Sequence, residues 1–85
     1  MTIHLKVITP QKLLAEADAD AVFLPTLEGQ IGVLPGHRPL YTALGRGVLS
    51  YRAEGDEESF AVKGGFAEVR PDDVVVVTEV DEDEG

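Results

Sequence analysis

Residues 13–23 read Leu-Leu-Ala-Glu-Ala-Asp-Ala-Asp-Ala-Val-Phe, and this stretch decides between a helical and a β fold. Alanines occupy the odd positions from 15 to 21, and acidic residues occupy the even positions from 16 to 20. Alanine favours helix, but a helix would spread these acids around its circumference. A strand places all of them on one solvent-exposed side. The alternation therefore predicts a β-strand over residues 13–23.

The same two-residue period runs through most of the remaining chain. Near the N-terminus, Ile3, Leu5 and Val7 alternate with polar residues and predict a strand. Further strands are predicted at residues 30–34, 48–53, 59–63, 66–70 and 74–80. Short segments rich in Gly, Pro and Asp separate them, among them residues 25–29, 35–37, 45–47, 54–56, 64–65 and 71–73. Many short strands with regular breaks are typical of a β-sandwich or a small barrel, so we expect one antiparallel all-β domain.

Length and composition set the limits of this domain. The chain of 85 residues is long enough for one domain, and an apolar content of 44% is enough for a core. It contains no cysteine, which excludes disulfides and thiolate chemistry. No apolar run approaches the ~20 residues that span a bilayer. We expect a single β domain over residues 1–80, followed by an acidic tail at residues 81–85.

The charge balance excludes two classes of partner. Seven basic residues face 16 acidic ones, for a net charge of −9, and five of the acids lie in the last seven residues. Without those seven residues the net charge is still −4. Nucleic acids and anionic lipid surfaces are bound through Lys and Arg, which are scarce here. We therefore expect no nucleic-acid partner and no direct membrane insertion.

The chain shows no pattern of catalytic or ligand-binding residues. It lacks the glycine-rich loop ending in Gly-Lys-Ser or Gly-Lys-Thr that cradles nucleotide phosphates. His4 and His37 fall in unlike contexts, a strand and a turn, whereas a metal site would need them to converge with a carboxylate. Neither Ser50 nor Ser59 has an adjacent histidine to activate it. We predict no catalytic residue, no cofactor and no metal site.

One predicted strand carries more apolar surface than a sandwich needs. Residues 74–77 are four consecutive valines, and successive strand residues point to opposite faces of a sheet. In a two-layer sandwich only one face of each sheet meets the core. The other pair of valines is either covered within the chain or buried by a partner protein. The residues alone leave both interpretations open.

Four ordered segments together resemble the epsilon subunit of F-type ATP synthases. The longest is residues 28–44, EGQIGVLPGHRPLYTAL, and the others are residues 5–10, LKVITP, residues 64–69, GGFAEV, and residues 74–78, VVVVT. The resemblance covers nearly the whole chain up to residue 79. It implies a flattened antiparallel β-sandwich of two five-stranded sheets. It also implies a non-catalytic subunit of the central stalk, with no active site of its own.

The resemblance further implies partners and contact residues. The domain would link the gamma subunit to the membrane-embedded ring of c subunits, in ATP synthesis coupled to ion transport. Its location would be the cytoplasmic face of the bacterial plasma membrane, as a peripheral part of the complex. Contacts with gamma are expected at Thr9, His37, Thr42, Val74 and Val76. Contacts with the rotor ring are expected at Glu28, Gly29, Gln30 and Ile31.

Two departures from the family pattern change what we expect. Gln30 stands where relatives often carry glutamate, so the ring contact would rest on hydrogen bonds and depend weakly on salt. Family members usually continue into a helical hairpin that can inhibit ATP hydrolysis and, in some, binds ATP. This sequence stops at Gly85, so we expect neither property from it.

One alternative comes from a different class of protein. Lipoyl and biotinyl carrier domains are also small, acidic and all-β, and they carry a cofactor on a lysine in a turn. Lys63, beside two glycines, is the candidate for such a modification. Its neighbours Val62 and Gly64 differ from the Asp-Lys-Ala and Met-Lys-Met settings of those domains. The carrier function therefore remains the second hypothesis.

Overall fold

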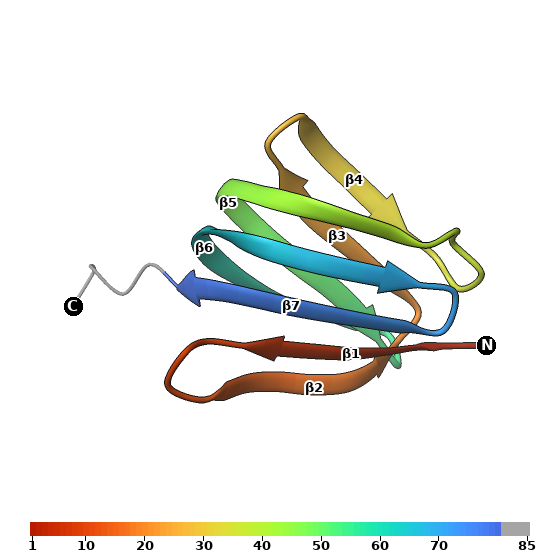
Figure 1. Cartoon of the computed structure of the whole chain (residues 1–85). Helices are drawn as coiled ribbons and strands as arrows, with labels where there is room; N and C mark the ends of the chain where they lie inside the picture. The colour runs from red at the N-terminus through yellow and green to blue at the C-terminus, as the bar shows by residue number, and fades with distance from the viewer. Residues whose placement is uncertain (81–85) are drawn as a thin grey trace.

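Seven strands form one hydrogen-bonded sheet. The computed structural model describes residues 1–80, and the acidic tail predicted at residues 81–85 lies outside this range. The strands are β1 (Ile3–Ile8), β2 (Leu13–Ala19), β3 (Ala21–Thr26), β4 (Gly29–Val33), β5 (Leu40–Ala53), β6 (Asp56–Arg70) and β7 (Asp73–Val80). Their order across the sheet is β2-β1-β7-β6-β5-β3-β4, and every pair is antiparallel except β1 with β7 (Figure 1). The predicted all-β fold class is confirmed.

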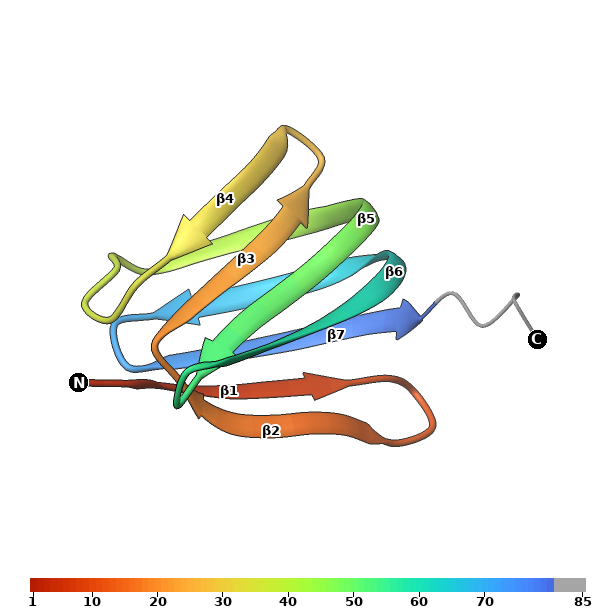
Figure 2. The same cartoon turned by 180° about the vertical axis from the view of Figure 1, so that it is seen from behind.

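Two long strands fold this sheet into two layers. β5 and β6 pair along their whole length and bend where Leu44 lies opposite Gly65. On one side of the bend, residues 65–70 of β6 pair with β7; on the other, residues 50–52 of β5 pair with β3. The front layer of Figure 1 therefore contains β2, β1, β7, the second half of β6 and the first half of β5. The rear layer, seen from behind in Figure 2, contains β3, β4 and the other halves of β5 and β6.

The strands of this sheet differ in three places from those predicted by the sequence. The breaks predicted at residues 45–47 and 64–65 are bends inside β5 and β6, because pairing resumes on both sides of each bend. The two five-stranded sheets are accordingly two layers of a single seven-stranded sheet. Conversely, the single strand predicted over residues 13–23 is broken at Asp20. The Asp20 N–H donates to the Arg52 carbonyl (2.7 Å) where the chain crosses between layers.

The bend in β6 requires two glycines. Gly64 and Gly65 have φ angles of 119° and 126°, a region that residues with a side chain rarely adopt. A Cβ atom at Gly65 would also lie 2.0 Å from the carbonyl oxygen of Val77 on β7. The hydroxyl of Thr78 donates to the carbonyl of Gly64 and ties the two strands at the same point. Residues 64–65 thus form a corner at which β6 passes from one layer to the other.

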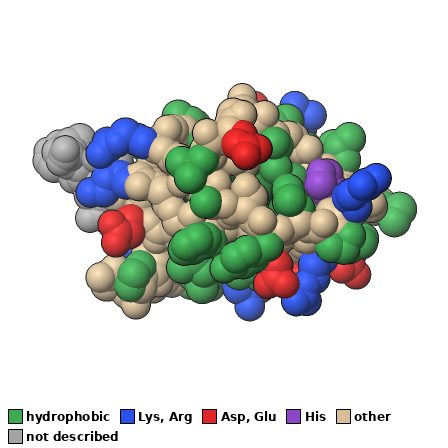
Figure 3. Space-filling model, turned by 45° about the horizontal axis from the view of Figure 1, so that its top comes forward, with side chains coloured by type: hydrophobic (Ala, Val, Ile, Leu, Met, Phe, Trp, Pro, Cys, Tyr) green, Lys and Arg blue, Asp and Glu red, His purple; other side chains and the backbone are tan. Residues whose placement is uncertain are grey.

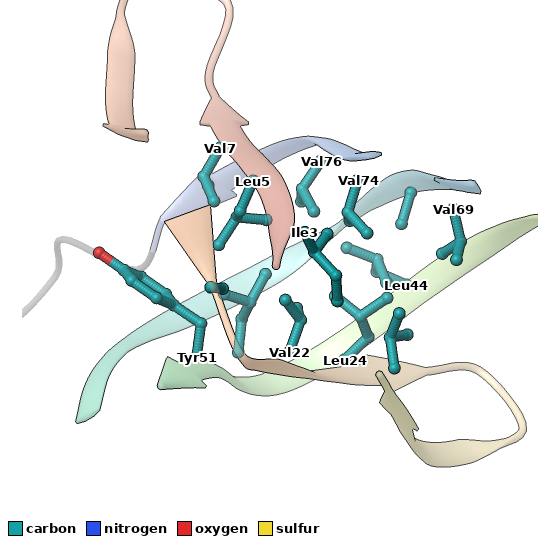
Figure 4. Packing of buried hydrophobic residues seen from close by; sticks show 14 of the residues in the cluster. Ile3, Leu5, Val7, Val22, Leu24, Leu44, Tyr51, Val69, Val74 and Val76 are labelled. Atoms are coloured by element: carbon teal, nitrogen blue, oxygen red, sulfur yellow. The ribbon is translucent and has the colours of Figure 1, made fainter. Parts of the chain in front are cut away.

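The core lies between the two layers and is aliphatic except for Tyr51. Inward-facing side chains from both layers interdigitate, as Figure 4 shows for the central part of the cluster. The largest fully buried side chains are Ile3, Leu5, Val7, Val22, Leu24, Val33, Leu49, Val62, Val69, Val74 and Val76. Among residues 1–80, every buried side-chain nitrogen and oxygen has a hydrogen-bond partner. Nor does this part of the chain contain a helix with the length and apolarity of a transmembrane segment.

Replacing Gly65 with alanine should destabilise the fold by roughly 3 kcal/mol, because the new Cβ would meet a backbone oxygen in a strained conformation. Gly36→Ala is the matched control. Gly36 has a φ of 91°, but nothing lies within 4 Å of a Cβ placed there. That variant should lose only about 1 kcal/mol. Urea denaturation measures both, and equal losses would show that the approach to Val77 imposes no constraint.

Candidate protein-binding interface

The outward side chains of the front layer change from apolar to charged along the strands. Strand pairing aligns these side chains in rows that cross the layer. The row nearest the bend contains Ala43, Phe66, Val77, Ile8 and Leu13. The next row contains Tyr41, Glu68, Val75, Lys6 and Glu16. The third contains Arg70, Asp73, His4 and Asp18. One end of this face is therefore apolar and the other end is charged.

The apolar end is well exposed. Phe66 and Leu13 each expose 50% of their surface, and Val77 exposes 42%. Tyr41 is 69% exposed and stacks on Phe66, with ring centroids 5.9 Å apart and an interplanar angle of 7°. The lower half of Figure 3 shows hydrophobic side chains gathered on this face, with acidic and basic side chains around them. We call Leu13, Tyr41, Phe66, Val75 and Val77 the outer apolar patch. Contiguous exposed surface of this kind marks protein-binding sites.

Two shallow hollows flank Phe66. One has a volume of about 350 Å³ and is lined by Tyr41, Glu68 and Val75 as well as Phe66 and Val77. The other has a volume of about 240 Å³ and is lined by Phe66, by the glycine bend of β6, by residues 77–79 of β7 and by Pro10. Within residues 1–80, no group of His, Cys, Asp and Glu is arranged to hold a metal ion. The hollows suit the apolar side chains of another protein rather than an enclosed small substrate.

The structure decides which valines of β7 can meet a partner. Val74 and Val76 have no exposed surface, because their side chains fill the core between the layers (Figure 4). The expected contact of these two residues with gamma is therefore corrected. Val75 and Val77 alternate with them and point outward from the front layer. The surplus apolar face that four consecutive valines predict is this outer pair.

The other three residues expected to contact gamma do not converge. Thr9 lies in the β1–β2 turn, at the end of the sandwich opposite the β4–β5 loop that holds His37 (Figure 1). The Thr9 hydroxyl accepts hydrogen bonds from two backbone N–H groups of its own turn (3.1 and 3.0 Å). His37 Nδ1 lies 2.7 Å from the neighbouring backbone carbonyl oxygen of Arg38. Thr42 is partly buried and lies opposite the buried Ala67. A partner that reaches all three must cover more than one side of the domain.

The β3–β4 turn forms a projecting tip at the top of Figure 1. The hydroxyl of Thr26 donates to the carbonyl of Gly29 and accepts from the backbone N–H of Glu28, which closes this turn. The exposed residues predicted to contact the ring are Glu28, Gly29 and Gln30. Ile31 is partly buried and packs against the core instead. The exposed apolar residue of the tip is Leu27, at 71%. We call residues 26–30 the β3–β4 tip.

The position of Lys63 disfavours the carrier hypothesis. Lys63 is exposed, but it lies inside β6, opposite Arg46 in the paired strand β5. A carrier domain presents its modified lysine in a turn. Lys63 is not in a turn, because β6 continues on both sides of it, from Asp56 through the glycine bend to Arg70.

Tyr41 and Phe66 are absent from the predicted contacts, although a signal for Phe66 is present in the sequence. Residues 66–70 alternate, so that Phe66 shares a face with Glu68 and Arg70, while the two residues between them face the core. An aromatic residue on the polar side of a strand indicates an exposed apolar site. Tyr41 carries no such signal, because its place beside Phe66 depends on how β5 pairs with β6.

Comparison with known proteins assigns the fold to a family. The family model of the ATP synthase, Delta/Epsilon chain, beta-sandwich domain, matches residues 2–83. The ATP synthase epsilon chain of a Synechococcus species is 46% identical over 77 residues, which are 91% of this chain and 56% of that protein. The chain therefore spans little more than half the length of this relative.

Solved structures give the same answer for the fold. A chain of the Euglena gracilis mitochondrial ATP synthase, in a structure of OSCP, F1 and the c-ring, matches with a TM-score of 0.86 at 30% identity. The match covers 94% of this chain and 52% of that chain. A chain of the Tetrahymena thermophila mitochondrial ATP synthase, from its central stalk and c-ring, matches with a TM-score of 0.75 over 93% of this chain and 64% of that chain. At 17% identity, this second likeness concerns the fold alone.

Adjacent valines of β7 should respond very differently to truncation. Val76→Ala removes two methyl groups from the core and should cost about 2 kcal/mol or more of unfolding free energy. Val77→Ala changes an outward side chain and should cost less than about 1 kcal/mol. Thermal and urea unfolding of the two variants measure the difference. A larger loss for Val77 would reverse the assignment of the two faces.

Proposed function

The chain belongs to the beta-sandwich domain family of the ATP synthase delta/epsilon chain, and from this premise we propose that it is a non-catalytic part of the central stalk. In this role it links the gamma subunit to the ring of c subunits, in ATP synthesis coupled to ion transport. The complex would hold it at the cytoplasmic face of the bacterial plasma membrane. The observation that carries the proposal is the outer apolar patch, a contiguous apolar surface that a partner would cover.

The outer apolar patch is the surface proposed to bind gamma. Stable protein interfaces bury about 1,200 Å² or more in total and place aromatic residues at their centre, inside a polar rim. The patch has this arrangement, with Phe66 and Tyr41 near Glu68 and Lys6. The two rings already stack on one another, so little side-chain entropy remains to be lost on binding. These properties support a protein partner of apolar and aromatic character.

The β3–β4 tip is proposed to contact polar loops of the c ring. Gly29 has a φ of 118° and no side chain, so the tip can approach another backbone closely. Gln30 offers an uncharged amide that both donates and accepts hydrogen bonds. Leu27 adds an exposed apolar side chain beside them. The contact should therefore be largely insensitive to ionic strength.

Strand β5 connects the two proposed contact surfaces. Tyr41 of the outer apolar patch lies near its start. The backbone N–H of Leu27 at the tip donates to the carbonyl of Ala43, two residues further along the same strand (3.2 Å). A force applied at the tip would therefore reach the patch through a hydrogen-bonded sheet with a close-packed core, which deforms little. A coupling part of a rotor needs this stiffness and needs no active site.

Phe66→Ala should weaken binding to purified gamma roughly 10- to 100-fold, because a buried aromatic at an interface centre contributes most of the binding energy. Val48→Ala is the matched control. Val48 is 55% exposed on the rear-layer half of β5, so its truncation should change affinity less than about threefold. Calorimetric titration measures both variants. Equal losses, or no complex of the unmodified protein at micromolar concentration, would contradict the assignment of the patch to gamma.

Gln30→Cys should cross-link to a cysteine placed in the polar loop of the c ring, in the assembled synthase. The 85 residues contain no cysteine, so the introduced thiol is the single one in this sequence. Glu57→Cys is the control, because it lies beside the β5–β6 turn at the opposite end of the sandwich from the tip (Figure 1). We expect a cross-link from position 30 alone, with a yield that changes little with salt. Equal yields from both positions would contradict the proposed contact between the tip and the ring. So would the absence of a cross-link from position 30 in complexes whose assembly has been verified.

A further inference from the structure

A histidine between two carboxylates joins β1 to the edge strand β2. Nε2 of His4 lies 2.8 Å from Oε2 of Glu16, and Nδ1 lies 3.4 Å from Oδ1 of Asp18. All three side chains stand on the outer face of the front layer, toward its charged end. The proposed contacts with gamma and the c ring make no use of them. This cluster is therefore a separate feature of the domain.

Both contacts can be hydrogen bonds only when the imidazole carries two protons. A neutral imidazole has one N–H donor and one nitrogen that only accepts, whereas an ionised carboxylate only accepts. Loss of the second proton therefore leaves one ring nitrogen facing a carboxylate without a hydrogen between them. It also removes the positive charge that Glu16 and Asp18 share.

We propose that His4, Glu16 and Asp18 form a proton-dependent clasp that holds the edge strand β2 against β1. Strand β2 lies at the edge of the sheet: among residues 1–80 it pairs with β1 alone, and alanine, which is depleted in strands, supplies three of its seven residues. The clasp is closed when the imidazolium lies between the two carboxylates, and it opens when the ring becomes neutral. The pairing of β1 with β2 persists in both states, but β2 opens more often in the second.

The charges around His4 favour its protonated form. The charged groups near it are Lys6 on β1, Glu16 and Asp18 on β2, Asp72 in the turn before β7, Asp73 at the start of β7, and Arg70 on β6, opposite Asp73. Acidic groups outnumber the two cations, Lys6 and Arg70. The backbone N–H of His4 donates to the carbonyl of Asp72 (2.9 Å), which fixes the start of β1 beside the acidic turn. The hydrogen bonds to Asp18 and Glu16 raise the pKa of His4 above its ordinary value of 6.5.

The raised pKa sets the pH window of the clasp. A group whose folded pKa exceeds its unfolded pKa contributes its full stabilisation below the unfolded value and loses it as pH rises through the folded value. For His4 the contribution is complete below about pH 6.5 and disappears at higher pH. The clasp is therefore closed in weakly acidic solution and open in alkaline solution.

A pH titration by NMR, combined with amide hydrogen exchange, tests the clasp. The chain has two histidines, and the second, His37, contacts a backbone carbonyl in the β4–β5 loop rather than a carboxylate of β2. His4 should titrate above 6.5, and Glu16→Gln with Asp18→Asn should lower that value. Protection factors of β2 amides, compared with those of β5 and β6, should fall roughly two- to fivefold between pH 5.5 and 8.5.

The controls separate the clasp from a general effect of pH. His4→Gln should remove the pH response of β2, and His37→Gln should retain it. A His4 pKa at or below 6.5 in the unmodified protein would overturn the proposal without recourse to any variant. An equal pH response of β2 in the unmodified protein and in His4→Gln would overturn it as well. Neither result bears on the binding of gamma, so the two proposals fail independently.

Discussion

The approach of Gly65 on β6 to the carbonyl oxygen of Val77 on β7 is the contact on which the two-layer fold depends. It allows β6 to leave the rear layer and continue in the front layer without ending. β7 follows the second half of β6, and β1 and β2 follow β7, so all of the front layer is positioned from this point. The same bend brings Phe66 to the outer surface next to Val77. One backbone contact therefore both encloses the core and displays the proposed interface.

β7 divides its apolar side chains between stability and binding. Its inner valines fill the core opposite β3 and β5, and its outer valines extend the patch around Phe66. Because neighbouring residues of a strand face opposite ways, a change on one side leaves the packing of the other largely intact. Partner affinity can therefore vary at Val75 and Val77 without loss of the fold. The residues that determine stability and those proposed to determine affinity alternate along this strand, so the two properties can change separately.

Alternation predicts most strands of this domain, but it does not predict where the sheet bends. The pattern of residues 13–23 continues through Asp20, and only the hydrogen bond to Arg52, distant in sequence, reveals a corner there. Residues 45–47 and 64–65 have the composition of turns, yet their strands continue because pairing resumes beyond them. Local composition identifies flexible backbone, whereas long-range pairing decides whether the chain reverses.

The predicted contact residues were likewise limited by what local sequence can show, because it does not define how strands pair. Four consecutive valines indicate two apolar faces, but not which face is inside. That choice follows from the pairing of Leu5 with Val74, which aligns the inward side of β7 with that of β1. The exposed turn around Gly29 could be predicted from local sequence, because no long-range contact is needed to define it, whereas the ring contact of residues 28–30 stays a prediction. The aromatic stack was not, since Tyr41 meets Phe66 diagonally across two strands.

The parallel pairing of β1 with β7 has a consequence for biosynthesis. β1 emerges from the ribosome first, yet one of its two neighbours in the sheet is the last strand of the domain. Until residues 73–80 have been made, Leu5 and Val7 lack the valines they pack beside, and the apolar side of the nascent β1–β2 hairpin stays uncovered. Contacts so distant in sequence close slowly and favour association with other apolar surfaces in the meantime. Folding of this domain therefore cannot be completed before residues 73–80 have been made.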